Sequence, residues 1–115
     1  MFYMDKLERR IMVIMSSKMN ERYVVLGVVF RARWIDGMEV AICDELNTSI
    51  LADFLKNSKF YGELKTVVAA QEIYELLLPC IGSLELKSLN EMESSKLGQV
   101  QAILNGIVDY LRGKI

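Results

Sequence analysis

A loose group of acidic residues around the middle of the sequence is the first candidate for chemistry. Asp36, Glu39, Asp44 and Glu45 fall close together, and Glu72 lies further along the chain. Carboxylates on neighbouring strands can hold the two ions of a metal-dependent nuclease, which lie about 4 Å apart. Consecutive strand residues point to opposite faces, however, so Asp44 and Glu45 would not share an ion if the strand continues through them. We therefore expect no metal site and no catalytic residue. The alternative is a metal-dependent nuclease with a rearranged carboxylate site made by Asp44, Glu45 and Glu72.

The residue types that usually accompany such carboxylates are missing or isolated. The sequence has no histidine, which removes the most common general base and the most common zinc ligand. Cys43 and Cys80 are far apart and lack the short spacings of zinc and iron–sulfur sites. We therefore expect two reduced thiols, no cofactor, and a protein that is not an enzyme.

The charges are unevenly distributed along the chain. Residues 1–35 hold seven Lys or Arg against three acids, although the whole chain has a formal net charge of −1. A basic surface of this kind can contact the phosphates of a nucleic acid. A nucleic-acid-binding domain is therefore a further alternative, and its candidate residues are Arg9, Arg10, Arg22, Arg31 and Arg33.

Membrane and export signals are not found in the sequence. The longest apolar stretch, residues 23–30, is far shorter than the roughly 20 residues that a membrane-spanning helix needs. The first ten residues mix acidic and basic side chains and lack the apolar core of a signal peptide. We expect a cytoplasmic protein that does not contact membranes.

The first half of the chain predicts an antiparallel meander, a set of strands that pair in sequence order. Apolar and β-branched runs indicate strands over residues 10–16, 22–33 and 38–43. Residues 17–20 form a polar break. Residues 34–37 end in Asp-Gly, the pair typical of a hairpin turn, and we place the second turn there.

The second half alternates helices and strands. A helix over residues 49–57 follows capping residues, and a strand is expected over 64–70. Another helix ends before Pro79, and residues 81–86 indicate a short strand. From Ser94 onward, apolar residues recur at intervals of three and four, which predicts an amphipathic helix of about four turns. We expect one α/β domain over residues 1–115, with a small mixed sheet covered by two to three helices.

Several segments resemble an uncharacterised archaeal family related to endonuclease V, which has an RNase H-like fold. The family's Gly-Val-Val strand and returning strand are similar to residues 25–31 and 36–40. Its next helix and strand are similar to residues 55–67, and its closing helix is similar to residues 96–115. The resemblance implies an RNase H-like topology.

The sequence departs from this family at the positions of its acids. The first strand of the family ends in an Asp-Asp pair, where this sequence has Ser16 and Ser17. A later strand of the family ends in an acid, where this sequence has Ala70 followed by Glu72. The chain is also shorter, mainly before the final helix. Neutral side chains leave a divalent ion poorly compensated, so the resemblance implies a shortened member without the metal-binding carboxylates.

The composition indicates a role in binding. Apolar residues make up 52% of a chain that is too short to bury them all. Of the seven methionines, Met12, Met15, Met19 and Met38 are candidates to face a partner, although most methionines are expected in the core. We expect a non-catalytic domain that interacts with another protein or forms a homodimer.

Overall fold

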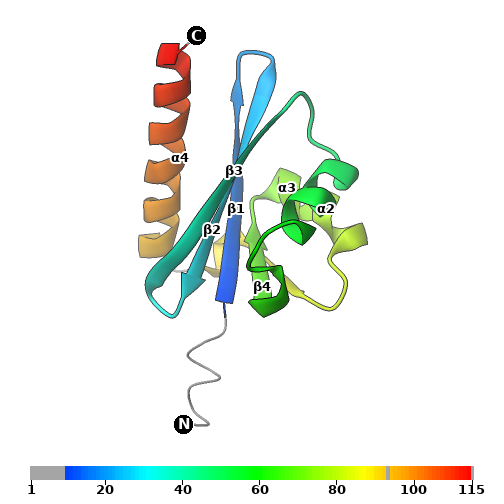
Figure 1. Ribbon diagram of the computed structural model, residues 1–115. Coiled ribbons are helices and arrows are strands. Elements are labelled where there is room, and N and C mark those ends of the chain that lie inside the picture. Colours follow the sequence, from blue (N-terminus) through cyan, green and yellow to red (C-terminus); the bar gives the residue numbers. More distant parts are fainter. Residues whose placement is uncertain (1–9, 93, 115) are drawn as a thin grey trace.

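A five-stranded sheet with helices on both faces makes up the computed structural model, which describes residues 10–92 and 94–114 (Figure 1). The strand order is β3-β2-β1-β4-β5. Pairs β1–β2 and β2–β3 are antiparallel, whereas β1–β4 and β4–β5 are parallel. The predicted α/β class, with a mixed sheet that starts as an antiparallel meander, is confirmed. The strands are β1 (Arg10–Met19), β2 (Arg22–Arg31), β3 (Trp34–Cys43), β4 (Leu64–Ala69) and β5 (Glu85–Ser88).

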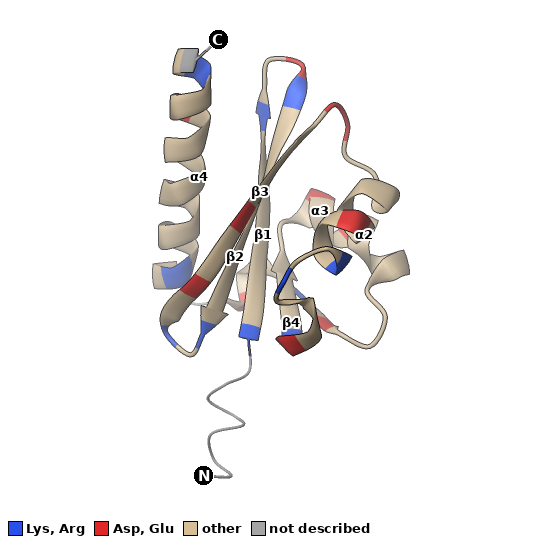
Figure 2. Cartoon of the chain, in the orientation of Figure 1, with Lys and Arg blue, Asp and Glu red and all other residues tan. Residues whose placement is uncertain are grey.

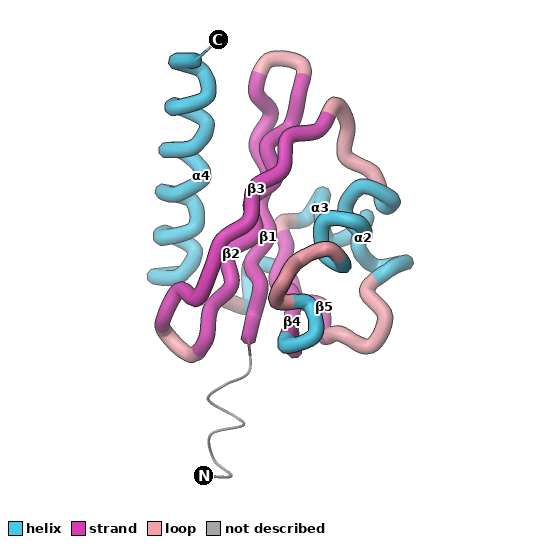
Figure 3. The backbone as a smooth tube through the Cα atoms, in the orientation of Figure 1, coloured by secondary structure: helices cyan, strands magenta, loops and turns pink. Residues whose placement is uncertain are grey.

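In the described residues, three α-helices and three short 3₁₀ turns connect and cover these strands (Figure 3). The side chain of Asn47 caps the helix that begins at Thr48 by accepting a hydrogen bond from the backbone N–H of Ile50. No helix within residues 10–92 and 94–114 combines the length and apolar character needed to cross a bilayer. The helices are α2 (Thr48–Lys56), α3 (Gln71–Leu77) and α4 (Ser94–Lys114), and the turns are η1 (Tyr61–Glu63), η2 (Leu78–Cys80) and η3 (Leu89–Glu91).

The middle of the sheet is buried on both faces because residues 11–15 of β1 and 24–30 of β2 have no polar side chain. Met12 and Ile14 of β1 point toward α2 and α3, where they pack with Leu51 and Ile73. The alternate residues of β1 and β2 point toward α4. There they meet a stripe of Val100, Leu104 and Val108, spaced four residues apart on one face of the helix. The amphipathic character expected for this helix is confirmed, and it is longer than expected.

The second hairpin turns earlier than the Asp-Gly pair predicted. Strand β2 ends at Arg31 and β3 starts at Trp34, so the turn is made by Ala32 and Arg33, and Ala32 has a positive φ of 57°. The placement of the turn at residues 34–37 is therefore wrong. The register shift between Val29 and Phe30 places Asp36 and Gly37 inside β3, where an irregularity in the pairing accommodates them. The first strand is likewise longer than expected and continues through Ser17 to Met19.

Gly37 does not form the turn, and its missing side chain makes room for a neighbouring ring. A Cβ built on Gly37 would lie 2.5 Å from two ring atoms of Phe60, which precedes η1. The missing side chain therefore lets Phe60 lie directly on β3. The guanidinium of Arg10 and the ammonium of Lys59 lie 6.0 and 5.2 Å from the centre of the same ring, which adds cation–π attraction.

Arg10, at the start of β1, forms ion pairs with acids of β3 and η1. Its Nε donates to Asp36 Oδ2 of β3 at 2.6 Å, and its Nη1 lies 3.0 Å from Glu63 Oε1 of η1. Arg31 Nη2 approaches the other oxygen of Asp36 at 4.0 Å. The hydrogen bond from Arg10 is the main reason that the pKa of Asp36 lies below its usual 3.8. The group joins three segments that are distant in sequence.

We predict that Gly37→Ala lowers the free energy of unfolding by about 1–3 kcal/mol, because the new methyl group must displace Phe60. The matched control is Gly106→Ala in α4, where a Cβ meets no atom within 4 Å. That substitution should raise stability by about 0.5–1 kcal/mol, since alanine favours a helix over glycine. Urea denaturation measures both values, and a Gly37→Ala protein as stable as the wild type would contradict the packing described for Phe60.

We predict a pH-dependent effect of Asp36→Asn. A carboxyl group with a lowered pKa in the folded state stabilises the fold fully above its unfolded pKa, near 3.8, and this contribution is lost as the pH falls through the lowered value. The variant should therefore be less stable than the wild type at neutral pH, and the difference should shrink in acid. Urea denaturation at a series of pH values measures this, with Asp109→Asn on α4 as a control for loss of an exposed carboxylate. A difference that stays constant into acid would contradict the role of the Arg10 pair.

Candidate functional site

Strand β3 forms one edge of the sheet and exposes apolar side chains there. In the described part of the chain it has one neighbouring strand, β2, so the backbone N–H and C=O groups along its outer side lack a strand partner. Met38, Val40 and Ile42 alternate along it with exposed fractions of 51%, 47% and 41%. Trp34, at the start of the strand, is 70% exposed. A long apolar edge of this kind is a ready template for pairing with another chain.

The position of helix α4 explains why this stripe stays uncovered. Met38, Val40 and Ile42 pair with Val28, Leu26 and Val24 of β2, respectively, and these partners belong to the core under α4. The stripe therefore lies on the α4 face of the sheet. Helix α4 packs mainly against β1 and β2, and in Figure 1 β3 crosses the sheet diagonally away from α4, toward the loop before α2.

The methionines separate clearly between core and surface. Met12, Met15 and Met19 are at most 5% exposed, and they belong to the two cores on either face of β1. Met38 is half exposed on the edge strand. The expectation that most methionines fill the core holds for this group, and Met38 is the member of the group that can contact a partner.

The opposite face of β3 borders a pocket of about 560 Å³, formed between the strand and α2. Apolar side chains line much of it, among them Val25, Ile50 and Phe54. Two carboxylates, Glu39 of β3 and Asp53 of α2, also line it. The sequence alone places Glu39 in the loose acidic group of residues 36–45, for which we expect no metal site. Its position between Gly37 and Ala41, on the inward face of a strand, was the available signal that it lies against another element.

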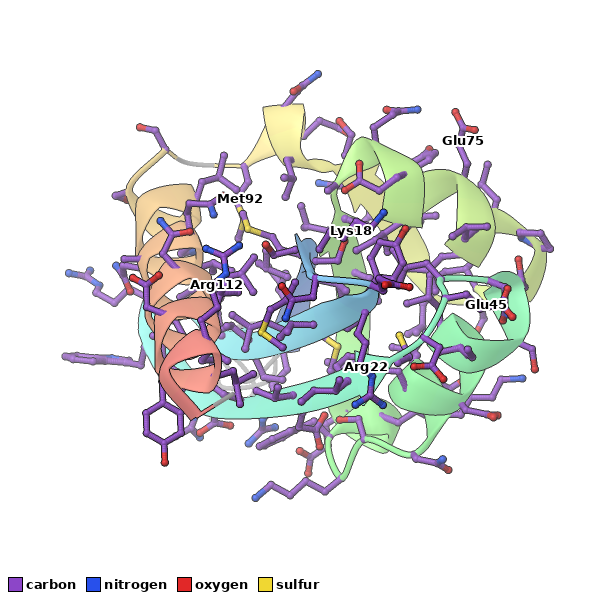
Figure 4. The ribbon with its side chains drawn as sticks, turned by 90° about the horizontal axis from the view of Figure 1, so that it is seen from above. Lys18, Arg22, Glu45, Glu75, Met92 and Arg112 are labelled. Atoms are coloured by element: carbon purple, nitrogen blue, oxygen red, sulfur yellow. The ribbon has the colours of Figure 1, made fainter. Side chains whose placement is uncertain are left out.

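The structure places the three candidate carboxylates of a metal site on two exposed segments, Asp44 and Glu45 on one and Glu72 on the other. Asp44, directly after β3, accepts a hydrogen bond from Arg22 Nε at 3.0 Å. Glu45 is exposed beside it, on the side of α2 in Figure 4, and Glu72 is exposed in the first turn of α3. Among the residues that the structure describes, no three Asp, Glu, Cys or His side chains are grouped so that they could hold a metal ion.

The arginines proposed for nucleic-acid binding are divided between two ends of the sheet (Figure 2). Arg10 and Arg31 are paired at one end of the β1–β2 ladder, and Arg22 is paired at the other, about 30 Å away at 3.3 Å per residue. Arg33 is exposed in the β2–β3 turn, near the first two. Arg9 lies outside the described residues. Arg10 and Arg22 already contact acids of this chain, which lowers the charge that they can offer to a phosphate.

The positions at which the resembled family has acids lie side by side. Strands β1 and β4 are parallel neighbours, and the backbone N–H of Ala70 reaches the carbonyl of Ile14 at 3.4 Å. Ser16 and Ser17 continue β1 at the same edge, and both are half-buried. A hydroxyl carries no charge at neutral pH and a methyl group has no ligand atom, so this edge is a poor site for a divalent cation.

Both cysteines are free and half-buried. Cys43 is the last residue of β3, and desolvation is the main cause that raises the pKa of its thiol above the usual 9.0. The thiol therefore stays protonated at neutral pH, which disfavours a nucleophilic role because the thiolate is the reactive form.

Comparison with known proteins identifies neither a family nor a function for this chain. No protein-family model matches it, and no curated protein matches it. A solved structure described as a protein of unknown function from Archaeoglobus fulgidus DSM 4304 is similar over 53% of this chain and 37% of that chain, with 23% sequence identity and a TM-score of 0.49. The match thus spans little more than a third of that protein, and it assigns neither a family nor a function to this one.

Proposed function

We propose that this chain is a non-catalytic domain that acts by binding protein, and that its first partner is a second copy of itself. The observation that carries the proposal is the exposed apolar edge of β3. Met38, Val40 and Ile42 are each more than 40% exposed there, next to backbone groups that lack a strand partner in the described part of the chain. Burying such a patch against another copy removes apolar surface from water and completes the hydrogen bonding of the edge.

Antiparallel pairing of two β3 strands about a two-fold axis matches the residues of this edge best in one register. With Val40 opposite Val40, Met38 of one copy lies opposite Ile42 of the other, so the apolar side chains pair with one another. On the other face Glu39 lies opposite Ala41. A register centred on Glu39 would place two like charges together, and one centred on Met38 would place Val40 opposite Asp36.

The residues at the two ends of the favoured register are acidic, and each forms an ion pair with an arginine of its own chain. Asp36 of one copy lies opposite Asp44 of the other. Each of these acids is already paired within its own chain, Asp36 with Arg10 and Asp44 with Arg22. The pairing therefore brings together neutralised ion pairs instead of bare carboxylates, and a two-fold interface of this kind closes on itself without forming a filament.

We also propose that the chain is a shortened RNase H-like protein related to endonuclease V, as the sequence resemblance implies. An antiparallel meander whose first strand then pairs in parallel with a later strand supports that topology. The serines and the alanine at the shared end of β1 and β4 support the loss of metal-dependent catalysis. A nuclease with a rearranged site would instead cleave nucleic acid with Mg²⁺ or Mn²⁺, and a nucleic-acid binder would give a salt-sensitive gel shift.

We predict that Met38→Lys separates the two copies and that Leu78→Lys does not. The two positions form a matched pair, because both side chains are 51% exposed and Leu78 lies on η2, away from β3. Light scattering should give twice the 13.2 kDa of one chain for the wild type and for Leu78→Lys. Lysine on an edge strand opposes pairing, so Met38→Lys should raise the dissociation constant about tenfold or more.

Two results would contradict self-association through β3. One is a wild-type protein that stays monomeric at high concentration. The other is a dimer that both lysine variants weaken equally, or that neither weakens. Thermal unfolding of each variant shows whether its fold is intact, so that a change in mass is assigned to the interface.

A further inference from the structure

One carboxylate oxygen beside the pocket between β3 and α2 is buried and has no hydrogen-bond donor within the described residues. This oxygen is Glu39 Oε1. The other oxygen, Oε2, accepts one hydrogen bond from the backbone N–H of Lys59 at 3.3 Å. A buried carboxylate oxygen without a donor is costly, so the Glu39 side chain gains stability if it turns this oxygen toward a donor bound in the pocket.

Both charged side chains that line the pocket are acidic, Glu39 and Asp53. Neither of them forms an ion pair with a Lys or Arg of the described chain. Two lysines follow Asp53 closely in the sequence: Lys56 forms no ion pair within the described residues, and Lys59 holds its ammonium 5.2 Å from the centre of the Phe60 ring. Two carboxylates without an ion-pair partner attract a cation rather than an anion.

The remaining walls of the pocket are apolar and carry an aromatic ring. A Cβ on Gly27 would lie 3.0 Å from Phe54 Cε2, so it is the glycine that allows the Phe54 ring to settle against β2. With Val25, Ala41 and Ile50, this ring provides aliphatic and aromatic contact in a pocket of about 560 Å³, a size typical of small-molecule sites. A hydrated metal ion gains nothing from such walls, because hard cations require oxygen ligands.

We propose that this pocket binds an organic cation, an alkylammonium or alkylguanidinium group with a short apolar body. The cationic N–H groups donate to the carboxylate of Glu39, whose side chain turns to bring Oε1 to the pocket, and they are attracted by Asp53, while the carbon chain lies along Phe54 and Ile50. Such a group can be a free small molecule or an Arg or Lys side chain of a peptide. The inference does not rest on self-association: Val40 borders both features, but the carboxylates and the Phe54 ring that would hold the cation belong to the pocket and not to the apolar stripe.

The test is a titration of the ¹⁵N-labelled full chain, followed by amide chemical shifts. The probes are N-butylguanidinium, the peptide acetyl-Ala-Ala-Arg-Ala-Ala-amide, 1-pentanol as a neutral control, and MgCl₂. We expect saturable shifts at amides of β3 and α2 around the pocket with one or both cationic probes, and none of comparable size with 1-pentanol or MgCl₂. Binding of butylguanidinium alone indicates a free ligand, and tighter binding of the peptide indicates a side chain as the source.

Variants assign the binding to the carboxylates. Glu39→Gln should weaken the affinity about tenfold or more, since a hydrogen bond to a charged group is lost. Glu21→Gln, which removes the same charge from the exposed β1–β2 turn, should leave the affinity unchanged. Asp53→Asn provides a second test in case Glu39→Gln fails to fold.

The proposal is overturned by any of three results. The first is that neither cationic probe gives saturable shifts up to about 10 mM, a concentration ten times a dissociation constant of about 1 mM. The second is that 1-pentanol or MgCl₂ gives shifts of equal size. The third is that neither pocket variant changes the affinity. A Glu39→Gln protein that loses the ligand but keeps the mass of the wild type separates this site from the dimer interface.

Discussion

Strand β1 is the constraint on which the arrangement of the other elements depends. It pairs with β2 on one side in the antiparallel sense and with β4 on the other in the parallel sense. A hairpin suffices for the first pairing, but a parallel pairing requires a crossover, and α2 lies within that crossover. Met12 to Met15 are buried on both faces, so both must be covered by helices. The two cores, the position of α4 and the exposed edge of β3 follow from this central strand.

The sequence predicts the elements of this fold well where local chemistry and packing agree. The apolar runs of the three meander strands, the capping residue Asn47 and the apolar stripe of α4 are each recognisable without a structure, because the same side chains specify the element and fill the core. The Asp-Gly pair shows the opposite case. Gly37 is required by Phe60, a residue 23 positions further along the chain. A local pattern cannot distinguish a glycine that turns the chain from one that receives a distant ring, so the turn was misplaced by a few residues.

The candidate sites depend even more on distant contacts. Sequence reasoning could name Met38 as a possible partner contact because methionine adapts to irregular surfaces, but it treated Met12, Met15 and Met19 alike. What separates them is strand order, since β3 is at the edge and β1 is at the centre. Glu39 was visible as an acid of the hairpin, yet its buried oxygen results from the approach of α2 and Lys59 to the inner face of β3. Neither feature has a signature within a short stretch of residues.

Strand order also sets a sequence of events during synthesis. The meander β1–β2–β3 is made of contacts between neighbours in the chain, so it can form as soon as residues 10–43 are available. Its α4 face, with Val24, Leu26, Val28 and Phe30, remains open until residues 94–114 have been made. During that interval the growing chain exposes one whole apolar face of a hairpin sheet to water. The nascent protein is therefore most prone to off-pathway association before α4 is available to cover this face.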